Sequence, residues 1–289
     1  MALEDPEGPT PVHVVEQQTQ MLPVLASPAG AARRLGSSRL LVSAGAIVVV
    51  LVAWELASTL GWISSDLLPT PGDVLRAGYS TQVDGYRGTS LFASIGVSMA
   101  RVAVGFAAAA VVGIPLGLIM GRVAFLSAVL DPFVQFFRPL PPLGYYTLLI
   151  LWFGIGDLAK VVLLFLSGLP LIIVGCAAAT SSVRVRDIEA AMSLGLSQRQ
   201  IFRRVILPSA LPEIITSLRL ALGTTFGSLV AAEIIAASSG LGFILYNAAN
   251  YLLTDVVFMG IIVIGIIAVL LDRLALLLQR KLVPWQGKG

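Results

Sequence analysis

The sequence predicts an all-α fold, a polytopic membrane bundle of six transmembrane helices. Composition is the first reason: of the 289 residues, 57% are hydrophobic and only 12% are charged, whereas an ordinary soluble domain has about 25% charged residues. The second is a mean hydropathy of +0.91, too apolar for a soluble core that also needs a polar surface. The third is length, because six spans of about 20 residues fit the chain with their loops. The bilayer must therefore solvate much of it.

The same composition excludes several classes of protein. The net charge of +3 comes without a basic cluster interleaved with aromatic residues, so no nucleic-acid partner is expected. Cys176 is the only cysteine, which excludes an intrachain disulfide and a multi-cysteine metal site. His13 is the only histidine and lies in a polar leader, so neither metal binding nor catalysis built on several histidines is expected.

Residues 1–38 are predicted to be a largely disordered cytoplasmic tail, and residues 39–289 the transmembrane domain. The tail holds five prolines and scattered acidic residues without helical periodicity. The first long apolar run begins near Leu40, too late for a secretory signal peptide. This run, Leu40–Leu60, is the expected first span. The following residues 61–90 combine prolines, glycines and mixed charge, which predicts an extramembrane loop.

The second predicted span, Phe92–Met120, is a continuous apolar run. Gly113 and Gly117 in it, and Gly121 directly after it, lie four residues apart. In a helix this spacing places small residues on one face, where they allow another helix to approach closely within lipid. We therefore expect this face to contact another helix of the bundle.

The third predicted span, Phe125–Phe153, is interrupted by Arg138-Pro139-Leu140-Pro141-Pro142. Three prolines in four positions do not fit a continuous helix. Irregular backbone at membrane depth is tolerated only against protein or water, so this broken span should face the bundle interior. The remaining segments are a fourth span Val161–Thr180, a polar interval 181–211, a fifth span Pro212–Ala237, a loop 238–255 with a short amphipathic helix, and a sixth span Val256–Leu271.

The distribution of lysine and arginine sets the predicted orientation, because these residues concentrate on the cytoplasmic side. With the amino terminus inside, thirteen fall on the inner side and three on the outer side. Both termini are therefore predicted to be cytoplasmic in a multi-pass protein of the cell inner membrane. The inner set is Arg33, Arg34, Arg39, Arg122, Arg184, Arg186, Arg199, Arg203, Arg204, Arg273, Arg280, Lys281 and Lys288, and the outer set is Arg76, Arg87 and Lys160.

The polar interval before the fifth span predicts a helical elbow. Glu189–Leu194 should form a short helix with Gly195 as its left-handed stop. Ser197 is expected to cap a second helix, Gln198–Ile206, which Leu207-Pro208 ends. On that second helix an apolar face and a basic remainder suit either docking onto a partner protein or lying on the lipid surface. The apolar face is Ile201, Phe202 and Val205, and the basic residues are Arg199, Arg203 and Arg204.

The spacing in this interval resembles the EAA loop of ABC-importer permeases. Glu189-Ala190-Ala191 is followed four residues later by Gly195, and Pro208 ends an Ile-Leu-Pro run that begins eleven residues past that glycine. In that family the loop is a coupling helix seated in a cleft of a cytoplasmic ATPase. The resemblance implies that the ATPase-coupling residues are Glu189, Ala190, Ala191, Gly195, Arg199, Phe202, Arg203, Leu207 and Pro208.

The resemblance covers roughly residues 40–285 and is to the sulfonate/nitrate/taurine branch. It implies type I ABC importer (MetI-like) architecture and import of a small sulfonate, taurine, by alternating access. Alkanesulfonate, nitrate or bicarbonate stay open as substrates, because the binding protein sets selectivity in such systems. Branch motifs are Leu68-Pro69-Thr70-Pro71, Arg138-Pro139-Leu140-Pro141-Pro142, Leu151-Trp152-Phe153-Gly154-Ile155-Gly156, Leu207-Pro208-Ser209-Ala210-Leu211-Pro212 and Gly240-Leu241-Gly242-Phe243. Likeness to taurine permeases lies in 230–236, 254–257 and 282–288.

The resemblance also implies partners: a second copy of this chain, two cytoplasmic ATPase subunits and an extracytoplasmic substrate-binding protein. The chain has no Gly-x-x-x-x-Gly-Lys-Ser/Thr phosphate loop. ATP and Mg are therefore expected on the ATPase, and this chain is expected to be neither an enzyme nor a holder of a cofactor or metal. An intramembrane enzyme would need a nucleophile–base or metal constellation, and a passive channel would not need a basic elbow; both alternatives fit less well.

Four of the charged residues inside predicted spans are candidate functional residues, because ionisable groups are expensive there and often functional. Arg101 is about 14 Å deep from the outer side at 1.5 Å per residue. Glu233 has a comparable depth, so the two should form a buried pair; a contact between Arg101 and the substrate is the alternative. Arg219 is expected to snorkel toward the cytoplasm. Arg138 opens the proline break and could attract an anionic sulfonate or satisfy carbonyls that the prolines leave free.

The segment Ser238–Leu253 is predicted to be the outer gate and part of the dock for the binding protein. Its two glycines allow a sharp turn. Bulky apolar side chains provide cover, and asparagines face water. The expected site residues are Gly240, Gly242, Phe243, Tyr246 and Asn250.

Overall fold

The protein is seen in a computed structural model that describes residues 35–61, 63–64, 66–236 and 238–285. Within these residues the chain is helical, and one isolated bridge joins Tyr86 to Thr89. The chain divides into two compact units, residues 1–56 and 57–289. Most of the predicted tail, residues 1–34, lies outside the described residues. The helix α2 (Leu35–Thr59) covers the predicted first span except its last residue, Leu60.

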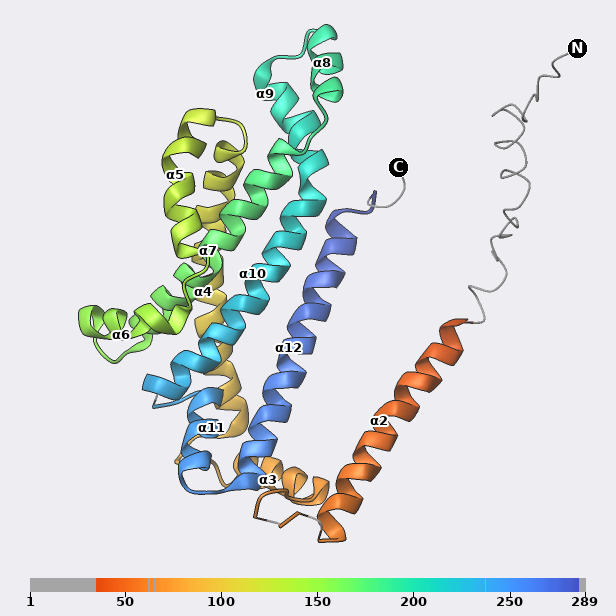
Figure 1. Ribbon diagram of the computed structural model, residues 1–289, viewed down its shortest axis with the longest axis vertical. Helices are drawn as coiled ribbons and strands as arrows, with labels where there is room; N and C mark the ends of the chain where they lie inside the picture. The colour runs from red at the N-terminus through yellow and green to blue at the C-terminus, as the bar shows by residue number, and fades with distance from the viewer. Residues whose placement is uncertain (1–34, 62, 65, 237, 286–289) are drawn as a thin grey trace, which may run out of the picture. The chain divides into compact units, whose positions relative to one another are not determined.

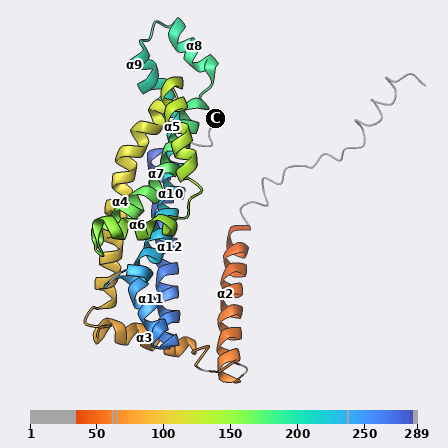
Figure 2. The ribbon, with the colours of Figure 1, turned by 60° about the vertical axis from the view of Figure 1, so that its left-hand side comes forward.

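Four long helices build the second unit: α4 (Leu91–Met120), α7 (Asp157–Ser181), α10 (Leu207–Ala236) and α12 (Thr254–Leu282). Figures 1 and 2 show α8 and α9 together at one end of this unit, here called the elbow end. They show α3 and α11 at the opposite end, here called the α11 end. The short helices are α3 (Pro71–Val83), α5 (Ala124–Phe137), α6 (Pro142–Phe153), α8 (Val185–Ser193), α9 (Gln198–Ile201) and α11 (Leu241–Asn250).

The expected spans correspond to these helices with one exception. Five helices in the described part of the chain are long and apolar enough to cross a membrane. The predicted third span forms the two shorter apolar helices α5 and α6. The first ends at Phe137 and the second begins at Pro142, where a missing N–H group is harmless because the first turn has no intrahelical acceptor. The proline break predicted in this span is confirmed.

The core of the second unit lies where α4 and α7 pack side by side in the same direction. Three glycines of α4 and the glycine at its C-cap each meet a residue that is 59 positions later in the sequence. A Cβ atom added to Gly117 would lie 2.6 Å from the carbonyl oxygen of Ile173, so only glycine permits this approach. The close contact predicted from the small-residue spacing is confirmed. The pairs are Gly105 with Leu164, Gly113 with Ile172, Gly117 with Cys176, and Gly121 with Thr180.

The predicted helix stop at Leu207-Pro208 is wrong. Helix α9 continues through a π-helical turn, Phe202–Ile206, into α10, so that residues 198–236 form one helical stretch. The N–H of Leu207 donates to the carbonyl of Phe202, five residues back. In a regular α-helix the Pro208 ring would collide with the carbonyl four residues earlier. The wider π turn moves that carbonyl, and the helix passes the proline without ending.

Two other helices differ from the prediction: α3 was not predicted, and α12 is longer than predicted. The loop predicted at residues 61–90 contains α3, which begins with a capping box: Thr70 accepts from the Asp73 N–H, and Asp73 accepts from the Thr70 N–H at 3.3 Å. The last span, predicted to end at Leu271, continues to Leu282 in α12. Its additional turns carry both leucines and basic residues, a composition that suits a helix end at a membrane surface.

Candidate functional site

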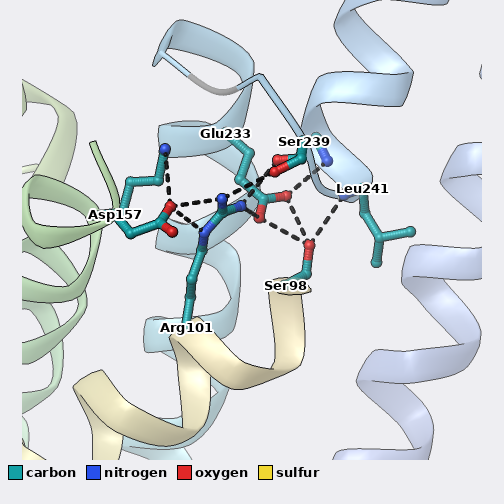
Figure 3. A network of polar contacts seen from close by, with 8 residues as sticks. Ser98, Arg101, Asp157, Glu233, Ser239 and Leu241 are labelled. Atoms are coloured by element: carbon teal, nitrogen blue, oxygen red, sulfur yellow. Dashed lines mark hydrogen bonds and ion pairs between the residues drawn. The ribbon is translucent and has the colours of Figure 1, made fainter. Parts of the chain in front are cut away.

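Arg101 and Glu233, predicted to pair inside the bundle, do so (Figure 3). Nη1 of Arg101 on α4 donates to Oε1 of Glu233 on α10 at 2.6 Å. The same nitrogen donates to the carbonyl oxygen of Ser239 at 2.9 Å. The arginine side chain is 5% exposed and the glutamate side chain 0% exposed. A pair this deeply buried is stable only if further hydrogen bonds satisfy the remaining polar atoms.

Glu233 obtains those hydrogen bonds from α4 and from the start of α11. Oγ of Ser98 lies 2.8 and 2.9 Å from the two carboxylate oxygens, and the N–H of Gly242 donates to Oε2 at 2.9 Å. Ser98 also accepts the N–H of Leu241 at 3.0 Å. These acceptors take the place of a helix cap, because α11 has no side-chain cap of its own. The first turn of α11 is thereby fixed to α4 and α10.

Asp157 and Lys160 complete this network, and sequence reasoning missed both. Nε of Arg101 donates to Oδ1 of Asp157 at 2.9 Å, and Nη2 of Arg101 forms an ion pair with the same oxygen at 2.7 Å. Nζ of Lys160 lies 3.4 Å from the same oxygen. The prediction counted Lys160 as an outer-side cation, but α7 begins at Asp157 and buries the lysine in its first turn. The spacing of Asp157 and Lys160, three residues apart just before an apolar run, could have indicated a charged pair in the first turn of a helix.

The two glycines of the predicted outer gate have different structural roles. Gly240 has φ +115° and lies against the carboxylate of Glu233, where any side chain would collide. Gly242 does not serve the turn. A Cβ atom there would lie 2.6 Å from the carbonyl oxygen of Val230 and 2.7 Å from Cβ of Glu233. Both glycines therefore permit the close approach of α11 to α10.

The other predicted gate residues lie on α11 itself. Phe243 is half-buried, whereas Tyr246 and Asn250 are exposed. Asn247 on the same helix accepts a hydrogen bond from the hydroxyl of Tyr86 at 3.3 Å. The helix therefore combines a face that packs on the bundle with a face that is open to other molecules.

Arg219, expected to snorkel toward the cytoplasm, has a partner on α12. It forms a bidentate ion pair with Asp272 on α12, in which Nη2 donates to Oδ2 at 3.0 Å and Nε donates to Oδ1. Because the last span was predicted to end at Leu271, Asp272 was not considered as a partner. Arg138 joins neither network: it is exposed at the C-cap of α5. In the described part of the chain its side chain makes no hydrogen bond or ion pair that could satisfy free carbonyls.

The elbow has the local geometry that its sequence predicts. Helix α8 stops at Gly195, whose φ of +73° lies in the left-handed region. The Gly195 N–H donates to the Met192 carbonyl, and the Leu196 N–H donates to the Ala191 carbonyl. Ser197 then starts α9 with a capping box to Gln200. The turn between the two short helices is therefore fixed by local hydrogen bonds.

The apolar face expected to dock on a partner is turned inward. Ile201 is fully buried, and Phe202 and Val205 pack against the same core cluster, which includes Ala191 of α8. Leu207 and Pro208 are half-buried as well. The exposed apolar residues are instead on α8 and its turn, where Leu194 is 80% exposed. Exposed elbow residues include Val185, Glu189, Ala190, Met192, Leu194, Gly195, Arg199, Arg203 and Arg204.

Comparison with known proteins gives the family. Residues 113–284 match the family described as "binding-protein-dependent transport system inner membrane component". The taurine transport system permease protein TauC of Escherichia coli strain K12 is 41% identical over 253 residues, which cover 87% of this chain and 92% of TauC. This chain belongs to that family. It is an ABC importer permease of the sulfonate, taurine and nitrate branch.

Two further relatives show how far this permease resembles known proteins. The aliphatic sulfonates transport permease protein SsuC of Bacillus subtilis strain 168 is 32% identical over 239 residues, covering 83% of this permease and 85% of SsuC. A chain of the MetNI methionine ABC transporter, solved in an inward-facing conformation, matches with a TM-score of 0.55 and 25% identity. That match covers 64% of this permease and 92% of the MetNI chain.

The matched region places the elbow, α10, α11 and the Glu233 arm of the network inside the family domain, whereas Arg101 and Ser98 precede it. In the described residues no group of three or more histidine, cysteine, aspartate or glutamate side chains could hold a metal ion. The structure therefore offers two features for a permease to use: an exposed elbow at one end and a buried charge network near the other.

Proposed function

We propose that this permease imports a small sulfonate, taurine, from outside to cytoplasm as the membrane subunit of an ATP-driven transporter. The observation that carries the proposal is the similarity to TauC, which is 41% identical over 92% of its length. The alternative substrates are an alkanesulfonate, in line with the similarity to SsuC, and nitrate or bicarbonate. ATP and Mg belong to the partner ATPase in this proposal.

The elbow end faces the cytoplasm in this proposal, and both termini are cytoplasmic. The basic residues of the elbow and its exposed side chains support this orientation. Glu189, Ala190, Arg199 and Arg203 are open to a partner, because their side chains are exposed and form no hydrogen bond or ion pair within the described residues. Each of two copies of this chain would present its elbow to one of two ATPase subunits. Ala191, Phe202, Leu207 and Pro208 would act indirectly, by holding the elbow on α7 and α10.

The α11 end faces outward and receives the substrate-binding protein. ATP binding would draw the two ATPase subunits and their elbows together, and the outer side would open by alternating access. Helix α11 is the outer gate in this mechanism. Its exposed face carries Tyr246 and Asn250, while its first turn is bound to α4 and α10 through Ser98 and Glu233. The gate is therefore connected to the long helices through hydrogen bonds rather than only through apolar packing.

Uptake by the reconstituted complex tests the substrate. The permease, its ATPase and its binding protein would be placed in liposomes, and uptake of radiolabelled taurine would be measured with and without internal ATP. We expect ATP-dependent uptake that unlabelled taurine suppresses more strongly than ethanesulfonate, nitrate or bicarbonate. If one of these competes more strongly than taurine, that compound is the better candidate for the substrate. Uptake without ATP would contradict the proposal of an ATP-driven importer.

Orientation can be measured separately. Cys176 is buried, so a cysteine introduced in place of Leu194 would be the accessible thiol in the described part of the chain. A membrane-impermeant maleimide should label Leu194→Cys only after the cytoplasmic side is exposed. As a matched control at the other end, Tyr246→Cys should react from the outside. The reverse pattern would invert the proposed topology.

A further inference from the structure

The two carboxylates that neutralise Arg101 have very different surroundings. Glu233 is 0% exposed and has contacts from Arg101, Ser98 and Gly242. Asp157 is 67% exposed, and all of its ion-pair contacts are made by one oxygen, Oδ1. Figure 3 shows Glu233 and Asp157 on different sides of the guanidinium group of Arg101. One counter-ion is therefore locked inside the bundle, while the other can leave by rotating its own side chain.

Three cationic nitrogen atoms converge on the position of Oδ1 in Asp157, two through hydrogen bonds and one through an ion pair. Two come from Arg101, at 2.9 and 2.7 Å, and one comes from Lys160, at 3.4 Å. The side chains of Arg101 and Lys160 are only 5% and 4% exposed. Cations this deeply buried need a negative charge at this place, whichever group supplies it. Because Asp157 itself is exposed, the place can be reached from outside the protein.

A buried hydroxyl near this place has no partner. Tyr146 on α6 is 1% exposed, and in the described part of the chain its hydroxyl makes no hydrogen bond. The ring packs with Ala159 and Ala232, the residues directly before Lys160 and Glu233. Its hydroxyl also interacts electrostatically with Arg101, Glu233 and Asp157. A buried hydroxyl without a partner is uncommon in proteins, and one near the Arg101 cation could donate to an anionic ligand bound there.

We propose that Arg101, Lys160 and Tyr146 form a binding site for the sulfonate group of the cargo, and that Asp157 occupies this site when no cargo is present. A sulfonate has one negative charge and three acceptor oxygens. It can accept from Arg101 and Lys160 as Asp157 does, and a further oxygen is available for the Tyr146 hydroxyl. The charge facing the two cations is unchanged by the exchange, since Arg101 and Lys160 face Glu233 and one displaceable anion before and after it.

The exchange also favours a particular class of sulfonate, and this step rests on the proposed function. When a sulfonate displaces Asp157, the aspartate loses its partners but remains next to the site. An aminosulfonate such as taurine carries an ammonium group that the released carboxylate can bind. An alkanesulfonate without an amine leaves the carboxylate without a counter-ion beside a second anion. Asp157 therefore occupies the site when no cargo is bound and favours a zwitterionic sulfonate over one without an amine.

Direct binding to the complex without its binding protein tests this site. The permease–ATPase complex in lipid nanodiscs would be dialysed against radiolabelled taurine, ethanesulfonate or sulfate. Asp157→Asn should bind ethanesulfonate and sulfate at least about tenfold more tightly, the size of effect that one opposite charge at this range has on an ionisation equilibrium. The preference for taurine over ethanesulfonate should fall in the same variant. The matched control is Asp131→Asn on α5, whose carboxylate contacts Gln135 and lies outside the network.

Two further variants separate a binding role from a structural one. Lys160→Met should weaken sulfonate binding about tenfold or more, and Lys160→Arg should retain it. If Lys160→Met does not fold, Tyr146→Phe decides instead. It removes a hydroxyl that has no partner in the structure, so thermal stability should be equal or higher, while sulfonate binding should fall roughly two- to tenfold.

Binding of all three ligands that is unchanged in both Asp157→Asn and Tyr146→Phe would overturn the proposed site. The result remains separable from the proposed function. If the wild-type transporter moves no sulfonate, that function is wrong, and sulfate binding by Asp157→Asn still decides whether the site holds an oxyanion. If the wild type imports taurine but these variants bind every ligand as it does, only the site is wrong.

Discussion

Charged side chains at the two ends of the second unit have opposite environments. Near the α11 end, Arg101, Lys160 and Glu233 are buried, and partners within the chain satisfy their charges. At the elbow end, Glu189 and Arg203 are exposed, and the described part of the chain supplies no partner for their side chains. The first group is part of the internal structure of the bundle. The second remains available to another protein.

The buried charges therefore contribute to the stability of the fold, whereas the exposed charges are available for coupling to a partner protein. A buried ion pair with complete hydrogen bonding resists the loss of either member, because the remaining charge would stay in a medium of low dielectric constant. An exposed charge can be removed at little cost to folding, since water solvates whatever remains. Variants at the α11 end should therefore damage the permease itself, whereas variants at the elbow should damage only its coupling to a partner.

The largest effect is expected for the buried pair. Glu233→Gln and Arg101→Gln should each lower the free energy of unfolding by about 3–5 kcal/mol, and the double variant should recover part of the loss. Thermal or denaturant unfolding of the purified permease in detergent would measure this. Asp272→Asn is a control, because the Arg219–Asp272 pair is partly exposed and should contribute much less. Penalties that simply add in the double variant would show that Arg101 and Glu233 act independently.

A smaller loss is expected from filling the space between α11 and α10. Gly242→Val would place atoms against the Val230 carbonyl, and Gly240→Val would also strain a backbone with φ +115°. Overpacking of this kind costs about 1–3 kcal/mol. Both variants should unfold at lower temperature and take up less substrate. In Gly96→Ala the new Cβ meets no atom within 4 Å, so stability should be retained. Normal uptake by both valine variants would exclude α11 as the gate.

At the elbow we expect the reverse: little change in stability and a loss of coupling. Gly195→Pro cannot adopt φ +73°, so the turn between α8 and α9 must change. Glu189→Lys reverses an exposed charge on α8 and disturbs no internal contact of its side chain. Both variants should insert in the membrane and unfold near the wild-type temperature, but lose most substrate-stimulated ATPase activity in the purified complex. Wild-type stimulation in either would refute the coupling role of the elbow.

The smallest effect concerns an exposed acid at the α11 end. Hydrogen bonds from Thr70 hold the pKa of Asp73 below its ordinary value of 3.8. A carboxyl whose pKa is lowered by folding stabilises the folded state above its unfolded pKa, and this contribution disappears as the pH falls through the lowered value. Amide exchange in α3, corrected for intrinsic rates, should therefore lose protection below about pH 4. Asp73→Asn should weaken α3 at neutral pH and remove that acid-dependent step.

The sequence predicts the regular parts of this molecule well. Arg101 and Glu233 could be paired from depth alone, because an α-helix rises by a constant amount per residue. The small residues at Gly113 and Gly117 indicated the close packing of α4 for a similar reason: periodic spacing defines a face. Gly195 and Ser197 were equally readable, since a left-handed turn and a helix cap depend on a few adjacent residues.

The missed features depend on irregular geometry or on an uncertain boundary. Lys160 was assigned to a loop because α7 begins a few residues before the apolar run does. Asp272 was overlooked because α12 continues past the predicted end of the span. Pro208 was taken as a helix stop, since no sequence pattern shows that a π turn will accommodate it. The inward orientation of Phe202 depends on how the elbow rests on α7 and α10, which local sequence does not determine.

The π turn at Phe202–Ile206 determines the orientation of the elbow relative to α10. A π turn is in effect an α-helix with one extra residue, and each residue of an α-helix rotates the chain by about 100°. Deleting one residue from this turn would restore a regular helix and leave α10 in place. It would also swing α8 about the helix axis, so that Glu189 and Leu194 would point in a different direction. The single extra residue therefore fixes the direction in which the elbow faces a protein that binds it.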